Sequence, residues 1–263
     1  MTASPSPHRR TPAWWVPVMI VAIAAVAIVL VLVVQRPESP SGTAAPPPAS
    51  ATPTATEVAD PPTAEDAPTA VGGEDAPDLS AAERRDPEDL LAYGDVDAPV
   101  VLVVFSDYQC PYCAKWSADT LPTLREYAEA GDLRIEFRDV NVFGDASVRG
   151  SRAAYAAAMQ GEFTAMHDAL FADGMARAGT QLTDDALLTL AADLGLDASQ
   201  FEEDYRSQAT ADEVARNQQL GLDLGVYSTP AFVLDGQPIV GAQPTAVFVD
   251  LLDAALESAP RGD

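Results

Sequence analysis

The hydrophobic pattern of the chain begins with one long apolar run. Residues 14–34 are twenty-one consecutive residues without a charge. At about 1.5 Å of rise per residue, a helix over this run spans roughly 30 Å, the hydrocarbon thickness of a bilayer. Arg9 and Arg10 precede the run and acidic residues dominate after it, which favours a cytoplasmic N-terminus. The pattern predicts a cytoplasmic segment 1–13 and a transmembrane helix 14–34. Its length favours an anchor over a cleaved signal peptide.

Residues 35–80 carry few bulky apolar side chains. They are rich in proline, alanine, threonine and acidic residues. Such a segment cannot bury enough apolar surface to offset the entropy lost on ordering. We therefore expect a disordered, semi-extended linker, with a folded and exported domain over residues 81–263.

Three patterns in that domain predict strands. The run 100–105 (VVLVVF) is continuously apolar, as in a strand buried on both faces. Residues 133–140 alternate apolar and polar side chains with the period of two of a strand. The runs 231–234 and 239–241 flank an Asp-Gly pair, which is a strong signal for a hairpin turn.

Helical patterns fill the segments between these strands. The first helix follows the first strand, and we expect Pro122 to interrupt it and Gly131 to cap its end. Residues 146–224 have a helical pattern throughout, with Thr183 and Asp197 as N-cap candidates. The order of the elements indicates an α/β fold whose reactive loop lies at the carboxyl end of the first strand.

Composition and charge argue against one broad class of function. The chain has 40 acidic and 15 basic residues, for a formal net charge of -25. Nucleic acids call for clustered lysine and arginine, so we expect no nucleic-acid partner.

The only two cysteines of the chain, Cys110 and Cys113, lie directly after the first predicted strand (FSDYQCPYCAKW). A disulfide across so short a loop gains little stability from loop entropy. A structural metal site needs four Cys or His ligands. Only two histidines exist, of which His8 precedes the membrane segment and His167 is expected on a helix surface. We therefore expect no metal and no cofactor beyond the redox-active cysteine pair.

Redox chemistry accounts for the position of the pair. The attacking species is the thiolate, and only about 3% of a free cysteine is ionised at pH 7. At the start of a helix, unpaired backbone N–H groups point at the Cys110 sulfur and stabilise its negative charge. Pro111 fits the first turn because the N–H that it lacks would be unpaired there. Cys113 falls one turn later, more buried, so we expect Cys110 to attack and Cys113 to resolve.

Two stretches, with the helical block between them, resemble a known family. APVVLVVFSDYQCPYCAKW and GVYSTPAFVLDGQPIVG are similar to the DsbA-like thiol–disulfide oxidoreductases of the thioredoxin superfamily, most closely to membrane-anchored bacterial members. The resemblance implies an α/β thioredoxin fold with a helical subdomain inserted over about 146–208. It also implies a cis Pro230 beside the cysteines, where the Thr229 backbone would hold an extended substrate segment.

The sequence departs from the family at two positions. Many relatives carry a buried acid six residues before the first cysteine, and this chain has Val104 there. The best-known strong oxidants have Pro-His between the cysteines, and here the second residue is Tyr112. A tyrosine offers no imidazolium to the thiolate, so we expect a milder oxidant. Lys115 either aids the thiolate or is simply solvated.

The sequence thus predicts an exported, membrane-tethered enzyme that forms disulfides in secreted proteins. Its expected partners are thiol-containing extracytoplasmic proteins and, since the chain has no second cysteine pair, a membrane redox partner that recycles it. One alternative is a disulfide reductase or isomerase of the same fold. An alternative of another class is a tethered binding or chaperone module with a redox-sensing cysteine pair.

Overall fold

The structure is a computed structural model that describes residues 70–73 and 76–259. The predicted cytoplasmic segment, the predicted transmembrane helix 14–34 and most of the predicted linker lie outside these residues. Within the described ranges, none of the helices has the length and apolar character needed to cross a bilayer.

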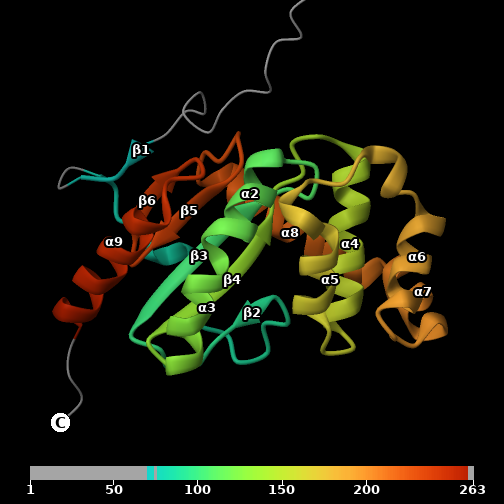
Figure 1. Cartoon of the computed structure of the whole chain (residues 1–263), viewed down its shortest axis with the longest axis horizontal. Helices are drawn as coiled ribbons and strands as arrows, with labels where there is room; N and C mark the ends of the chain where they lie inside the picture. The colour runs from blue at the N-terminus through green and yellow to red at the C-terminus, as the bar shows by residue number, and fades with distance from the viewer. Residues whose placement is uncertain (1–69, 74–75, 260–263) are drawn as a thin grey trace, which may run out of the picture. The chain divides into compact units, whose positions relative to one another are not determined.

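A six-stranded mixed sheet lies at the centre of the described domain (Figure 1). Its strands are β1 (Ala70–Val71), β2 (Ala92–Tyr93), β3 (Val100–Ser106), β4 (Leu133–Asp139), β5 (Ala231–Leu234) and β6 (Gln237–Val240). Their order is β1-β6-β5-β3-β4-β2, with β3 and β4 parallel and the other pairs antiparallel. The structure confirms the three predicted strand regions, and every residue of β3 is buried.

Helices cover both faces of this sheet. They are α2 (Pro111–Asp119), α3 (Leu121–Ala130), α4 (Asp145–Ala158), α5 (Phe163–Leu170), α6 (Asp184–Asp193), α7 (Ala198–Arg206), α8 (Gln208–Asp223) and α9 (Thr245–Ser258). Short 3-10 helices are η2 (Ser80–Ala82), η3 (Ala172–Gly174) and η4 (Gly179–Gln181). Side chains of α2, α3 and α9 pack on one face of β3, and those of α8 pack on the other. Helices α4 to α7 lie together beside the sheet, within or next to the interval 146–208 (Figure 1).

The local signals for helix ends are confirmed. Helices α2 and α3 are separated at Thr120, and Pro122 lies in the first turn of α3. Gly131 ends α3 with a left-handed φ of 86°. The side chains of Thr183 and Asp197 cap α6 and α7 by accepting backbone hydrogen bonds.

Two very short strands have no signal in the sequence pattern. β1 lies inside the segment 35–80 that the pattern assigns to the linker, and it pairs with β6. β2 precedes the first predicted strand, and it pairs with β4. Two residues cannot establish a hydrophobic period, and such strands are held by backbone hydrogen bonds to a neighbouring strand.

The polar side of β4 is buried rather than solvated. Its alternation of apolar and polar residues is typical of a half-exposed strand. Here Arg134, Glu136 and Arg138 are buried with the rest of β4, because residues 83–89 cover them. Arg138 pairs with Asp89 of that segment.

Glu136 is the centre of this buried ion-pair network. Its Oε1 accepts hydrogen bonds from the Arg134 Nε and the Arg85 amide, each at 2.9 Å. Its Oε2 accepts from the Arg138 guanidinium and the Arg84 amide, also at 2.9 Å. Burial raises the pKa of Glu136, but these donors outweigh it and hold the pKa below its ordinary value. One carboxylate therefore ties the segment before β2 to the sheet.

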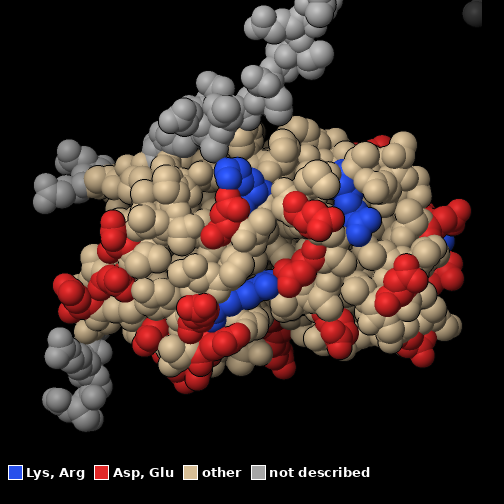
Figure 2. All heavy atoms as spheres, viewed as in Figure 1, with Lys and Arg blue, Asp and Glu red and all other residues tan. Residues whose placement is uncertain are grey.

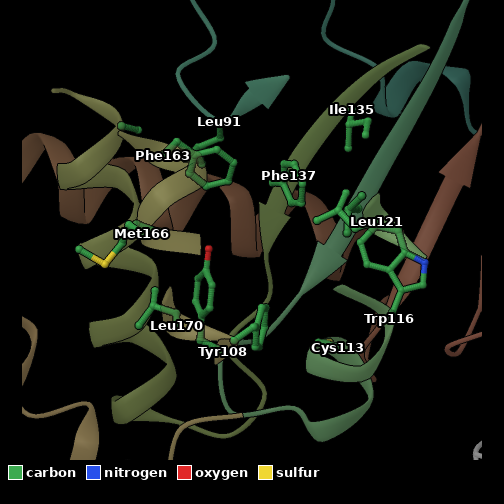
Figure 3. Close-up of a cluster of buried hydrophobic side chains, with 14 of the residues drawn as sticks. Leu91, Tyr108, Cys113, Trp116, Leu121, Ile135, Phe137, Phe163, Met166 and Leu170 are labelled. Atoms are coloured by element: carbon green, nitrogen blue, oxygen red, sulfur yellow. The ribbon is translucent and has the colours of Figure 1, made fainter. Parts of the chain in front are cut away.

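His167 lies in the core, which corrects the expectation that it would lie on a helix surface. Its exposed fraction is 1%. In α5, residues Phe163, Met166, His167 and Leu170 follow the spacing of a single helix face, and that face is buried. Figure 3 shows Phe163, Met166 and Leu170 of this face. Burial lowers the pKa of His167 to about 4, so its ring is neutral at pH 7.

Replacing Glu136 by glutamine tests the buried network. The Glu136→Gln variant keeps the shape of the side chain but leaves the buried Arg138 guanidinium without its full charge compensation. We expect the free energy of unfolding to fall by about 3–5 kcal/mol, measured by equilibrium urea unfolding. The matched control is Glu202→Gln, which removes an exposed pair with Arg206 at 3.0 Å and should cost less than about 1 kcal/mol. Equal losses in the two variants would contradict the assignment.

Candidate active site

The cysteine motif joins the central strand to the helix that follows it. β3 ends at Ser106, and Cys110 is the N-cap of α2, with extended backbone angles of φ -81° and ψ 116°. Pro111 takes the first helical position, as the sequence predicts. Cys110 and Cys113 are both free thiols in the structure. The pair therefore lies at the carboxyl edge of β3, where the pattern of elements predicts it.

Cys110 is placed to be ionised. Its Sγ accepts a hydrogen bond from the Cys113 amide at 3.4 Å. The Cys113 thiol contributes most to lowering the pKa of Cys110 to about 7, and the amides of Cys113 and Tyr112 act in the same direction against the effect of burial. In its protonated form, the Cys110 thiol donates to the Thr229 carbonyl at 3.1 Å.

Cys113 has the opposite character. Burial, and then the neighbouring Cys110, raise the pKa of Cys113 well above its ordinary value, although the Ser106 hydroxyl lowers it. As whole residues, both cysteines are only 1% exposed. The exposed fractions therefore do not show the expected difference in burial, but of the two cysteines Cys110 alone lines the adjacent groove.

The segment before β5 faces the cysteines. The Thr229–Pro230 peptide bond is cis, as the resemblance implies, and β5 begins at Ala231. Thr229 and Pro230 line the same groove as Cys110. The structure therefore brings together residues that are more than a hundred positions apart in the sequence.

An apolar groove lies beside Cys110. Its volume is about 530 Å³, and it lies between the start of α2, the loop after β4 and the segment before β5. The groove is lined by Cys110, Pro111, Tyr112, Val142, Phe143, Tyr227, Ser228, Thr229, Pro230, Val240 and Gly241. None of these described lining residues is charged. In Figure 2 the upper edge of the domain is largely uncharged, whereas acidic side chains gather along the lower edge.

Two exposed aromatic residues that line the groove, Phe143 and Tyr227, were not among the residues singled out from the sequence. Phe143 is 54% exposed and Tyr227 is 75% exposed, which is unusual for large aromatic side chains. Phe143 lies in the loop after β4, and Tyr227 lies two residues before Thr229. In the sequence they are marked only as aromatic residues in the loop after β4 and in the loop before β5.

Val104, Lys115 and Trp116 lie close to the cysteine motif in the sequence, and the structure shows the surroundings of each. Val104 is buried in β3, so the position of the family's acid is filled by an apolar side chain. Lys115 is half-exposed and pairs with Asp119 one turn later on α2, which favours the solvated interpretation of this lysine. The Trp116 ring packs 4.8 Å from the ring of Phe232, between α2 and the sheet (Figure 3).

Fold and site together define a class of protein. A Cys-x-x-C pair that starts the helix after a central strand, facing a cis-proline, is characteristic of thiol–disulfide oxidoreductases of the thioredoxin type. The thioredoxin family model matches residues 86–254. The chain belongs to the thioredoxin family, as a DsbA-like thiol–disulfide oxidoreductase.

Individual relatives agree with this assignment. The "Probable disulfide bond formation protein D" of Bacillus cereus is 28% identical over 148 residues, which are 54% of this chain and 68% of the relative. A thioredoxin-like oxidoreductase from Silicibacter pomeroyi DSS-3 has a crystal structure that is 28% identical, with a TM-score of 0.56 over 66% of this chain and 100% of that one. Oxidised BdbD from Bacillus subtilis shares the fold at 21% identity, with a TM-score of 0.59 over 72% of this chain and 99% of that one.

The chain also matches part of a different kind of protein. The Na(+)/H(+) antiporter NhaA of Herminiimonas arsenicoxydans is 31% identical over 170 residues, and the match spans 65% of this chain. It spans only 26% of the antiporter. The match therefore gives no support for transport by this chain.

The pKa difference between the two thiols predicts selective alkylation. With a pKa of about 7, roughly half of Cys110 is ionised at pH 7, against about 3% of a free cysteine. We expect the alkylation rate of Cys110 to reach half its maximum near pH 7, with Cys113 unmodified, as measured by iodoacetamide labelling and peptide mass spectrometry. In Cys113→Ala the midpoint should rise, because the largest contribution to the lowered pKa is gone. A wild-type midpoint above about pH 8.5, where free thiols titrate, would contradict this interpretation.

Proposed function

We propose that this chain is an exported enzyme that introduces disulfides into secreted proteins through the Cys110–Cys113 couple. The observation that carries the proposal is the position of Cys110 at the start of α2, where its sulfur accepts from the Cys113 amide at 3.4 Å and the residue lines the groove beside Thr229 and Pro230. A stabilised Cys110 thiolate lowers the free energy of the reduced enzyme. A couple whose reduced form is stabilised is a stronger oxidant.

The proposed reaction is thiol–disulfide exchange in two steps. A substrate thiolate attacks the Cys110 sulfur of the oxidised enzyme, the Cys110–Cys113 bond breaks, and Cys113 leaves with the electron pair and takes up a proton. A second substrate thiolate then attacks the substrate sulfur of the mixed disulfide and releases Cys110 as a thiolate. The substrate dithiol loses two electrons and the enzyme disulfide gains them. This chemistry needs no metal or cofactor beyond the cysteine pair.

The groove supports a preference for extended apolar segments. The Thr229 carbonyl accepts from the Cys110 thiol, and in the oxidised enzyme the disulfide-bonded Cys110 sulfur can no longer donate to it. That carbonyl is then free to accept from a substrate N–H, while Pro230 and the aromatic walls contact the substrate side chains. The uncharged lining favours uncharged residues around the substrate cysteine.

We extend the proposal to the organisation of the whole chain. The uncharged run 14–34 would anchor the chain with segment 1–13 in the cytoplasm, and residues 35–80 would serve as the linker to a catalytic domain over 81–263. Its helical insertion would cover about 146–208. The sequence contains a single cysteine pair, so a membrane redox partner or a thiol pool would reoxidise it.

A second candidate function is disulfide reduction or isomerisation. The pKa of Cys110, about 7, resembles that of thioredoxin rather than the much lower value of DsbA. A less stabilised thiolate gives a less oxidising couple. This observation favours a mild couple, and the reduction potential decides between disulfide donation and reduction.

Serine variants separate the enzyme from a tethered binding module. We expect Cys110→Ser to lower the rate of oxidation of a dithiol peptide by at least about a thousandfold, because the residue that forms the mixed disulfide is gone. With a peptide dimer linked by a disulfide, the Cys110 thiolate of Cys113→Ser should attack one sulfur and release the other peptide as a thiolate, so that the mixed disulfide between Cys110 and the peptide accumulates and is visible by mass spectrometry. Peptide binding without any mixed disulfide in Cys113→Ser would favour the binding module.

Substituting Tyr112, which lies between the cysteines, tests what sets the reduction potential of the couple. A histidine at position 112 adds an imidazolium near the thiolate, so we expect Tyr112→His to lower the pKa of Cys110 and raise the reduction potential. A change of about one pKa unit corresponds to about 30 mV for a two-electron couple. Tyr112→Phe is the matched control, because it removes the hydroxyl without adding a charge. An unchanged potential in Tyr112→His would refute the explanation of a milder oxidant.

A further inference from the structure

One buried carboxylate connects the two loops that border the groove. Asp107 directly follows β3 and has no exposed surface. Its Oδ1 accepts a hydrogen bond from the Gln109 amide at 2.7 Å, and its Oδ2 accepts from the Phe143 amide at 3.1 Å. The first loop leads into Cys110, and the second follows β4. The two oxygens of one side chain thus hold both loops.

These loops carry the two parts that a substrate would meet. The first loop ends at Cys110, whose amide also donates to the Asp107 carbonyl at 2.9 Å. The second loop presents Val142 and Phe143 to the groove. The distance between the reactive sulfur and this apolar wall is therefore set through Asp107.

The backbone angles of Gly144 also restrict the conformation of the loop that carries Phe143. Gly144 has φ 89° and ψ -151°, a region that is essentially restricted to glycine. A Cβ at this position would meet nothing within 4 Å, so the need for glycine comes from the backbone angles and not from crowding. The loop is held by Asp107 beneath it and by Gly144 at its end.

We propose that Asp107 is a positioning residue that holds the Val142–Phe143 wall against Cys110 and thereby sets a preference for substrate cysteines flanked by large apolar side chains. The proposal rests on the proposed function, because it concerns which thiols react at Cys110. It assigns to Asp107 no proton transfer and no contact with the substrate.

The test compares two peptides that differ only next to their cysteine. One peptide carries phenylalanine on both sides of a single cysteine and the other carries serine. The measured quantity is the ratio of their rate constants for mixed-disulfide formation with the oxidised enzyme. We expect Asp107→Asn to lower this ratio by about tenfold, because an amide accepts from one of the two loop N–H groups and presents its own NH₂ to the other. The loss should lie mainly in the apparent KM of the phenylalanine peptide.

Two glycine variants test the wall without touching a buried charge. Gly144→Ala strains the loop next to Phe143, so it should also lower the ratio. Gly131→Ala is the matched control: it has a positive φ of 86° and open space for a Cβ, but it lies at the end of α3, away from the groove. Its ratio should equal that of the wild type. If Asp107→Asn does not fold, the comparison of Gly144→Ala with Gly131→Ala decides whether the position of the Val142–Phe143 wall sets the ratio.

A double-mutant cycle separates positioning from general stability. Phe143→Ala removes the wall itself, so adding Asp107→Asn in that background should leave the ratio unchanged. Additive effects would overturn the proposal, as would a wild-type ratio near one or an unchanged ratio in both Asp107→Asn and Gly144→Ala. In each of these cases the proposed function stands, because the peptides still react. A wild-type enzyme that forms no mixed disulfide with either peptide would instead refute the proposed function, and this inference with it.

Discussion

The stabilisation of a thiolate at the first turn of α2 is the interaction on which the site depends. The Cys113 amide and thiol both act on the Cys110 sulfur, and they lower its pKa to about 7. Burial, and then the neighbouring Cys110, raise the pKa of Cys113, so one sulfur is ready to react and the other is held as a thiol. The two shifts are linked, because the Cys113 thiol contributes most to the lowered pKa of Cys110 and Cys110 adds to the effect of burial on Cys113. The division of roles between the cysteines therefore follows from where the helix begins.

The start of α2 follows β3, the buried central strand of the sheet. β3 is buried along its whole length between helices on both faces, and it pairs with β4 and β5. Its end therefore sets the position of Cys110, and the segment leading into β5 sets the position of Thr229. The neighbouring strand β4 is secured on its polar side by Glu136 and its arginine partners. A rigid frame of this kind allows short loops to carry the chemistry.

The parts of the fold that depend on neighbouring residues in the chain could be predicted from the sequence. The apolar run of β3, the Asp-Gly hairpin and the interruption at Pro122 each depend on neighbours in the chain, and the structure has all three. The burial of His167 was signalled locally, because His167 has the helical spacing of Phe163, Met166 and Leu170. The burial of the polar side of β4 depends on a segment far away in the sequence, so no local pattern could reveal it. The groove was missed for the same reason, because Phe143 meets Cys110 only after β3 and β4 pair. The cysteine motif could be read from the sequence because its helix start and its spacing are local.

The most direct test of this account is the reduction potential of the Cys110–Cys113 couple. The chain would be equilibrated in glutathione buffers, and its redox state followed by the fluorescence of tryptophan, including Trp116 one turn beyond the motif. Disulfide donation by a couple milder than DsbA predicts a value near -180 mV, at the isomerase end of the span of about -120 to -180 mV that known oxidants and isomerases occupy. A value at or below about -230 mV would mean that the reduced form is not stabilised enough to donate disulfides, and would contradict the account.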